Sequence, residues 1–369
     1  MRGYWIAKAL RWEPPAWTGH EERVVMRRQN WMRTVCATAA AVAVGLGMVS
    51  AQDPRTMGAP SGKVIRKDPA LDAIISPDAK MEILVKDYFA SGEGTVWVDD
   101  GQYLLISDQA ANRIYKWDDP SDKLSIYMEK AGYSGKDEDV PNIALFFYNG
   151  LHHIMLMGTN GLALDREGRL IVCARGDRQL VRIEKDGKRT VLADHWQNKK
   201  MPAPNDVVVK SDGSIYFVAQ LGHDAGRRDY APQAMYRWKD GNVDLITTEH
   251  SSGLAFSPDE KYMYVVTKGA LMRVDVLPDG TVANAIPFGG DQGGDGVKVD
   301  EKGNVYVGAS DGMRIMSPAG KVLGVIETGR FANMAFGGKD HKTMYIAVRR
   351  GLARIKFNVA GARVPGMKP

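Results

Sequence analysis

The chain has 369 residues, including 40 glycines and 17 prolines, and 44% of its residues are hydrophobic. This is enough for one large core or two modest ones. The formal net charge of +5 arises mainly in residues 1–51, which carry seven Lys/Arg against three Asp/Glu and leave the remainder at +1. Residues 52–369 therefore lack the strong positive charge that would indicate a nucleic-acid partner. Frequent turn residues and scarce helical periodicity favour an all-β chain.

Residues 1–51 are predicted to form an N-terminal extension and a secretory signal peptide that starts near residue 26. A basic stretch, MRRQNWMR, precedes the apolar stretch TVCATAAAVAVGLGMV, and VSA before Gln52 fits a small-residue cleavage site. The apolar run of roughly 16 residues is shorter than the ~20 that a membrane span needs, so an anchor is the less favoured alternative. We expect a periplasmic or secreted protein, cut near Ala51/Gln52 and free of the membrane after cleavage.

The composition divides the rest of the chain into three parts. Residues 52–80 are rich in Pro, Gly and charge and predict a linker, residues 81–358 hold the regular strand patterns, and residues 359–369 predict a frayed tail. Cys173 is the one cysteine in the sequence after residue 51, so an intrachain disulfide is excluded there. Its strand context favours a core residue over a catalytic thiol.

Six segments repeat one order of features: a small or polar start, an apolar strand, a turn with Gly or Asp, and further strands. The first five segments begin 67, 45, 47 and 43 residues apart. The six segments begin at Glu93, Asn160, Asn205, Ser252, Asp295 and Asn333. A period of about 40–45 residues with three or four short strands is typical of a β-propeller blade. The sequence therefore predicts an all-β, six-bladed β-propeller, with a strand in 81–88 that joins the last blade and closes the ring.

The first residue of each repeat is expected at one level of the central channel, because the innermost strand of each blade borders that channel. Five oxygen-bearing side chains with two carboxylates among them then form a ring at the channel mouth: Glu93, Asn160, Asn205, Ser252 and Asp295. Hard cations such as Ca²⁺ or Mg²⁺ prefer such ligands. Taken singly, each residue could instead cap backbone groups at a strand entry. No HExxH or paired Cys/His spacing predicts a tetrahedral zinc site.

Seven segments, in chain order from residue 68 to residue 356, carry a resemblance to a known family. They are LDAIISPDAKMEILVKD, GEGTVWVDDGQYLLISDQAANRIYKW, GTNGLALDREGRL, PAPNDVVVKSDGSIYF, SGLAFSPDEKYMYV, GDGVKVDEKGNVYV and FGGKDHKTMYIA. The chain resembles the gluconolactonase/senescence-marker-protein (regucalcin) family, and bacterial gluconolactonases most closely. The resemblance implies a metal-dependent hydrolase that opens a sugar lactone, a small-molecule substrate. A propeller of this size is usually sufficient as a monomer, so we expect a monomer.

The resemblance also implies one divalent cation at the channel mouth, most readily Ca²⁺, with Zn²⁺, Mg²⁺ or Mn²⁺ as alternatives. The ligands of the family fall on Glu93, Asn205 and Asp295, and a further Asn ligand falls on Ser252. The serine is a departure, because its hydroxyl is shorter and a poorer cation ligand than an amide oxygen. The resemblance places the general base on Asp295 and makes Asp206 a candidate for orienting Asn205.

The residues expected to contact the substrate lie in or near loops that depart from the family pattern. Asn160 falls on the pocket Asn of the family, and Asp206, His153, His152 and His223 are further candidates. The loops YNGLHHIMLMGTN and VAQLGHDAG differ from family sequences, and Thr95 replaces a usual Pro. The propeller and its metal are therefore better supported than the sugar-lactone specificity.

Three alternatives remain open on the sequence. The same ring can serve another lactone, an ester or a phosphotriester, because a fold does not fix its substrate. A propeller with Ser252 as the mark of a lost site would be a binding platform instead of an enzyme. A strictosidine-synthase-like activity shares the architecture but not the ligand ring, so Glu93, Asn205 and Asp295 argue against it.

Overall fold

The computed structural model describes residues 61–136, 158–221, 229–248, 252–267, 270–290, 294–310, 312–329, 331–348 and 350–367. Contacts divide the chain into two units after Thr56, and all of the described residues belong to the second unit, Met57–Pro369. No helix within these described ranges is long and apolar enough to cross a membrane.

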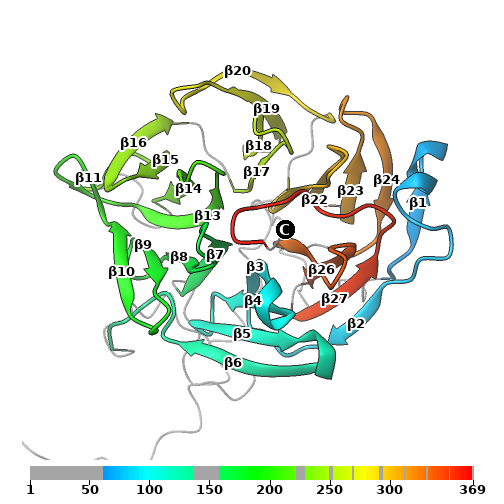
Figure 1. Cartoon of the computed structure of the whole chain (residues 1–369), viewed down its shortest axis with the longest axis horizontal. Coiled ribbons are helices and arrows are strands. Elements are labelled where there is room, and N and C mark those ends of the chain that lie inside the picture. Colours follow the sequence, from blue (N-terminus) through cyan, green and yellow to red (C-terminus); the bar gives the residue numbers. More distant parts are fainter. Residues whose placement is uncertain are drawn as a thin grey trace, which may run out of the picture. The chain divides into compact units, whose positions relative to one another are not determined.

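Six antiparallel sheets of the second unit stand around a central axis, as the sequence predicts (Figure 1). Blade 1 contains β3 (Gly92–Val98), β4 (Tyr103–Asp108), β5 (Arg113–Asp118) and β6 (Lys123–Glu129). Blade 2 contains β7 (Thr159–Leu164), β8 (Leu170–Ala174), β9 (Gln179–Ile183) and β10 (Arg189–Ala193). Blade 3 contains β13 (Ala203–Val209), β14 (Ile215–Gln220), β15 (Ala234–Lys239) and β16 (Asn242–Thr247). Blade 4 contains β17 (Leu254–Phe256), β18 (Tyr262–Thr267), β19 (Ala270–Val276) and β20 (Val282–Pro287). Blade 5 contains β21 (Val297–Val299), β22 (Val305–Ala309), β23 (Gly312–Met316) and β24 (Val322–Ile326). Blade 6 contains β25 (Met334–Gly337), β26 (Thr343–Val348) and β27 (Gly351–Lys356).

Two strands from the beginning of the described chain complete the ring. As expected, β2 (Glu82–Val85) pairs with β27 and becomes the outer strand of blade 6. The outer edge of blade 5 is covered by β1 (Val64–Arg66), which pairs with β24. The 3-10 turn η2 (Pro69–Ala73) follows, and Leu71 and Ile75 bury their side chains in the core of blades 5 and 6. The expected linker therefore differs from the structure from residue 61 onward, because its few apolar residues dock on the propeller.

The burial of the strands follows their distance from the axis. β4 and β8 are almost wholly buried, whereas β6 at the edge of blade 1 is mostly exposed. Short elements complete the fold: the hairpin of β11 (His195–Trp196) and β12 (Lys199–Lys200), and the 3-10 turns η3 (Asp99–Gly101) and η4 (Asp119–Ser121). Because each blade packs its faces on its neighbours, the hydrophobic core runs around the ring.

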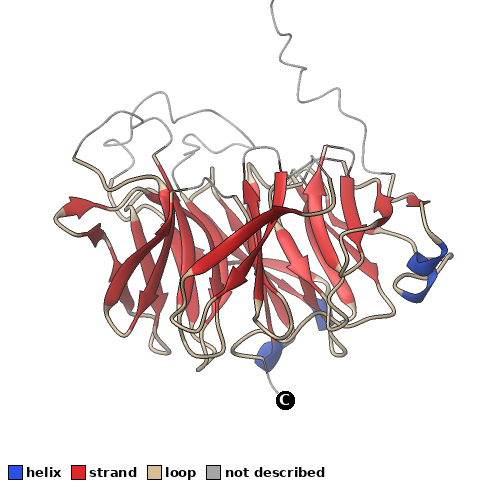
Figure 2. Ribbon diagram, turned by 90° about the horizontal axis from the view of Figure 1, so that it is seen from above, coloured by secondary structure: helices blue, strands red, loops and turns tan. Residues whose placement is uncertain are grey.

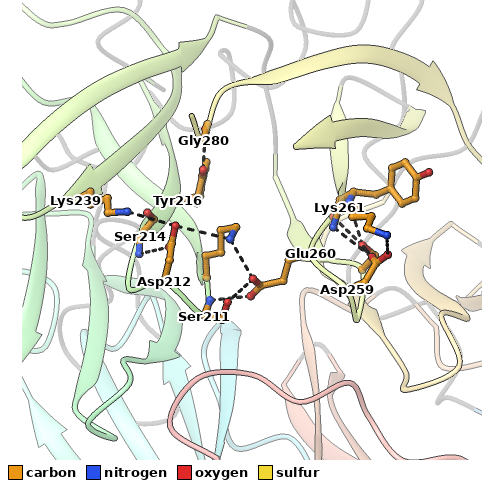
Figure 3. Close-up of polar contacts among 12 residues, drawn as sticks. Ser211, Asp212, Ser214, Tyr216, Lys239, Asp259, Glu260, Lys261 and Gly280 are labelled. Atoms are coloured by element: carbon orange, nitrogen blue, oxygen red, sulfur yellow. Dashed lines mark hydrogen bonds and ion pairs between the residues drawn. The ribbon is translucent and has the colours of Figure 1, made fainter. Parts of the chain in front are cut away.

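Polar contacts join the tight turns of adjacent blades. In Figure 3, Ser211 and Asp212 of blade 3 lie beside Glu260 of blade 4. The backbone amide of Ser211 donates to Glu260 Oε1 at 2.7 Å, and Lys210 Nζ lies 3.1 Å from Glu260 Oε2. Lys239 Nζ extends the network to Asp212 at 3.4 Å. These partly exposed ion pairs contribute modestly to stability but fix the relative position of the two turns.

The C-terminal segment does not fray but crosses the central axis (Figure 1). The amide of Ala362 donates to the carbonyl of Val299 at 2.9 Å, and Gly361 forms a β-bridge with Asp300. Further along, Gly366 lies against the backbone of Asp165. Seen from the side, the strands run between two faces that are formed by loops and turns (Figure 2). The segment thus covers the channel where the inner strands end.

Between this segment and the inner strands lies a cavity of about 120 Å³. Its walls are largely apolar, with Leu164, Val209, Phe256 and Phe336 among the lining residues. Lys298 is the one lysine among them. The lower channel is therefore a covered apolar space rather than an open polar pore.

Candidate functional site

The starts of the inner strands approach one another more closely than any side chain would allow. A Cβ atom added to Gly94 would lie 2.3 Å from the carbonyl oxygen of Asn160. A Cβ atom on Gly253 would lie 2.3 Å from the carbonyl oxygen of Asp295. Glycine is the residue that tolerates such close backbone contact. Each glycine follows a predicted ring residue, so these contacts draw the ring residues of neighbouring blades together.

Two carboxylates at the channel mouth, those of Glu93 and Asp295, are close enough to interact electrostatically. The pKa of Glu93 is raised to about 8, first by burial and then by the negative charge of Asp295. The Arg175 guanidinium and the Ser91 hydroxyl, which donates to Glu93 Oε1 at 3.2 Å, oppose this rise. The residues come from β3 and from the segment before β21, which lie far apart in sequence. The mouth therefore concentrates negative charge in a partly desolvated place.

Two amide side chains lie beside these carboxylates. Asn160 Nδ2 donates to Asn205 Oδ1 at 3.1 Å, and both residues are only 8% exposed. The other end of the Asn205 amide points to blade 4, because Nδ2 lies 3.4 Å from the carbonyl oxygen of Ser252. The Arg175 guanidinium also donates to Asn205 Oδ1. One amide oxygen thus collects donors from two directions at the centre of the ring.

The structure brings most of the predicted ring residues together. Glu93, Asn160, Asn205 and Asp295 are linked by the contacts above, and Ser252 joins through its backbone carbonyl. The sixth inner strand places Ala332 at the equivalent level, because its carbonyl accepts from the Gly296 amide at 2.7 Å. Asn333, the expected start of that repeat, lies one residue further along. His152, His153 and His223 lie outside the described residues.

Asp206 lies one residue beyond the ring and is buried. Its carboxylate accepts from the amides of Val207 at 3.0 Å and Leu254 at 3.3 Å, so it joins β13 to β17. Burial raises the pKa of Asp206, while Lys298, these amides and the Asn333 side chain hold it down. These contacts give Asp206 a role between inner strands, and its predicted effect on Asn205 stays a prediction.

The sequence analysis did not single out two positively charged side chains near the ring, Arg175 and Lys298. Arg175 directly follows β8, and its guanidinium lies among the ring residues. Lys298 lies in β21, where Nζ donates to Asn333 Oδ1 at 2.9 Å. Burial lowers the pKa of Lys298 and the charge of Asp206 opposes this. A lysine within the apolar strand VKV was a usable signal for Lys298. Arg175 gave no such signal, because arginines after strands are commonly solvated.

The donor set at the mouth fits a hard divalent cation. It offers two carboxylates and an amide oxygen, which are typical Ca²⁺ and Mg²⁺ ligands. Burial and the charge of Asp295 raise the pKa of Glu93 and so disfavour its ionised form, and a bound cation would favour that form. Groups of three or more His, Cys, Asp or Glu suited to a metal do not occur in the described part of the chain. The site therefore depends on the amide oxygen of Asn205 as well as on carboxylates.

Residues 91–350 match the protein family described as "SMP-30/Gluconolactonase/LRE-like region". The chain belongs to this family. Within it, the gluconolactonase of Zymomonas mobilis is 28% identical over 354 residues, covering 88% of this chain and 94% of the relative. A crystal structure provisionally assigned as a gluconolactonase is 27% identical with a TM-score of 0.69, covering 82% of this chain and all of the other.

A third comparison shows the fold alone. The structure of regucalcin from Agrobacterium tumefaciens, described as a calcium-binding protein, is 14% identical with a TM-score of 0.57. It covers 78% of this chain and 97% of the other. The family thus joins this chain to gluconolactonases by sequence and to a calcium-binding propeller by architecture.

Proposed function

We propose that this family member is a lactonase that opens a sugar lactone with the help of one divalent cation. The observation that carries the proposal is the convergence of Glu93, Asp295 and the Asn205 amide oxygen at the channel mouth. Membership of the SMP-30/gluconolactonase/LRE-like family supports lactone hydrolysis as the reaction class.

The residues that would hold the cation are Glu93, Asn205 and Asp295, with the Ser252 hydroxyl as the weakest ligand. When bound, the cation supplies Lewis-acid polarisation of the lactone carbonyl. We take Ca²⁺ as the natural ion because all of these ligands are oxygens; Mg²⁺, Mn²⁺ and Zn²⁺ remain as test ions. The protein itself fixes the ligand ring through the glycine contacts and the bond between Asn160 and Asn205.

Asp295 is the proposed general base. It takes a proton from a water molecule as the water oxygen forms a bond with the carbonyl carbon of the lactone. The bond between that carbon and the ring oxygen then breaks, and the ring oxygen receives the proton. The products are the open hydroxy acid and the unchanged carboxylate. Asn160 is placed to contact a sugar hydroxyl, and the candidates His153 and His223 remain part of this proposal.

Proton release from glucono-1,5-lactone tests the function. The protein from Gln52 onward is stripped with a chelator and then given Ca²⁺, Mg²⁺, Mn²⁺ or Zn²⁺ in turn, and the spontaneous rate is subtracted. Hydrolysis that requires the cation supports the proposal. Hydrolysis that survives chelation refutes the role of the metal. A bound cation without hydrolysis refutes the sugar-lactone assignment and directs attention to other lactones, esters or phosphotriesters.

We further propose that the protein is exported to the periplasm or outside the cell, which the signal-like segment before Gln52 supports, and that it acts as a monomer. N-terminal sequencing of the protein from a bacterial periplasm tests the cleavage point. A mature N-terminus that still carries residues 26–51 would contradict the assignment.

A further inference from the structure

Arg175 is the residue at the channel mouth whose role the proposed reaction leaves open. It follows the last residue of β8, and its backbone amide donates to the Gly158 carbonyl at 3.2 Å. The side chain is directed to the ring, where Nη1 donates to Asn205 Oδ1. Its Nε is buried and has no hydrogen-bond partner among the described residues. A guanidinium held with one donor unsatisfied is not in an optimal resting place.

The charge of Arg175 faces the same groups that would hold a cation. The negative charges of Glu93 and Asp295 both favour the charged form of the guanidinium, and the positive charge of Arg175 in return favours the ionised form of Glu93. The guanidinium carries its charge at every pH that the protein experiences. One positive group therefore contacts the ligand oxygen of Asn205 and offsets part of the charge of the two ligand carboxylates.

We propose that Arg175 is an internal competitor of the divalent cation. This inference rests on the proposed metal site. Without the cation, the guanidinium lies on the Asn205 oxygen and compensates part of the charge of Glu93 and Asp295. Binding of the cation requires the guanidinium to leave that oxygen, since two positive groups repel strongly at such short range. Arg175 thereby lowers the affinity of the ring and is moved toward the channel opening when the ring fills.

Two consequences separate this role from a purely structural one. Removing the guanidinium should tighten cation binding, whereas loss of a structural support would weaken it. The same removal should destabilise the cation-free protein, because Asn205 Oδ1 then loses a donor and the Asp295 carboxylate loses a nearby positive charge. A bound cation should reduce that destabilisation.

The test is calorimetric titration of Ca²⁺ and Mn²⁺ into the chelator-treated chain from Gln52 onward, with Arg175→Met, Arg175→Lys and Arg182→Met variants. Arg182 lies in the same blade, pairs with Glu184 at 2.8 Å and provides a matched loss of charge outside the ring. We expect Arg175→Met to lower the Kd roughly tenfold to a hundredfold. Arg175→Lys should fall between it and the wild type, and Arg182→Met should match the wild type.

Thermal unfolding with and without cation accompanies the titration and shows whether each variant folds. Equal or weaker cation binding in a folded Arg175→Met variant, with a wild type that binds, overturns the inference and leaves the metal site intact. Binding in Arg175→Met alone supports the inference in its strongest form. No binding in any folded variant overturns the inference together with the metal assignment.

Discussion

The substitution Glu93→Gln tests whether the buried charge at the channel mouth lowers the stability of the protein while it contributes to cation binding. Glu93 has its pKa raised from 4.5 to about 8 by burial and by Asp295. The folded, cation-free protein therefore binds an extra proton between these two pH values, and the stability that this proton provides is lost as pH rises through that window. At pH 7 the full shift corresponds to a penalty of at most about 3 kcal/mol. Because Glu93 is partly accessible, we expect about 1–3 kcal/mol.

Chemical denaturation of chelator-treated protein measures this effect. Glu93→Gln should be more stable than the wild type at pH 7 and 8, and the difference should shrink toward pH 5. The variant should also bind Ca²⁺ more weakly, since an amide replaces a carboxylate ligand. The wild type with saturating Ca²⁺ serves as the control and should lose the pH-dependent penalty. Equal stability at every pH, or a less stable variant at pH 8, would show that neither burial nor Asp295 disfavours the ionised form of Glu93 in the folded protein.

Four further predictions address the ring and the C-terminal segment. Asp295→Ala should lower kcat/KM about 10²–10⁴-fold, whereas Asp186→Ala in an exposed turn should retain activity; similar values for both would remove Asp295 as the base. Ser252→Asn should lower the Kd for Ca²⁺, as an amide oxygen reaches further than a hydroxyl, and an unchanged Kd in titration would place Ser252 outside the ligand set. Gly253→Ala should cost about 1–3 kcal/mol in denaturation and reduce turnover, because its Cβ would displace the Asp295 backbone; wild-type values would contradict the contact. Deleting residues 359–369 should lower the melting temperature without changing the Ca²⁺ affinity, and an unchanged melting temperature would show that the segment does not pack.

The sequence predicted the propeller because the repeat is regular. Each blade begins with a polar residue, an apolar strand and a turn, and closure by residues 81–88 follows from the missing outer strand of blade 6. The ring residues Glu93, Asn160, Asn205 and Asp295 were found by the same register. Such features depend on periodicity, which a sequence displays directly.

Other features depend on contacts between unrelated segments. Arg175 follows a strand in a position that is usually solvated, and only the approach of Asn205 from the next blade places its guanidinium in the ring. Leu71 and Ile75 lie in a Pro- and charge-rich stretch, so their docking on blades 5 and 6 was not visible. The C-terminal segment, whose glycines and prolines predict no strand, is held by backbone contacts with Val299 and Asp300.

The crossing of the axis by Ala362–Met367 makes the channel blind at one end. If the proposed reaction takes place at the ligand ring, water, substrate and product share the other end of the channel, so a product molecule must leave before the next lactone can enter. In a lactonase of this shape, accumulated hydroxy acid would occupy the route of entry and compete with substrate. The last residues of the chain, although remote from the chemistry, would in this way decide how turnover responds to its own product.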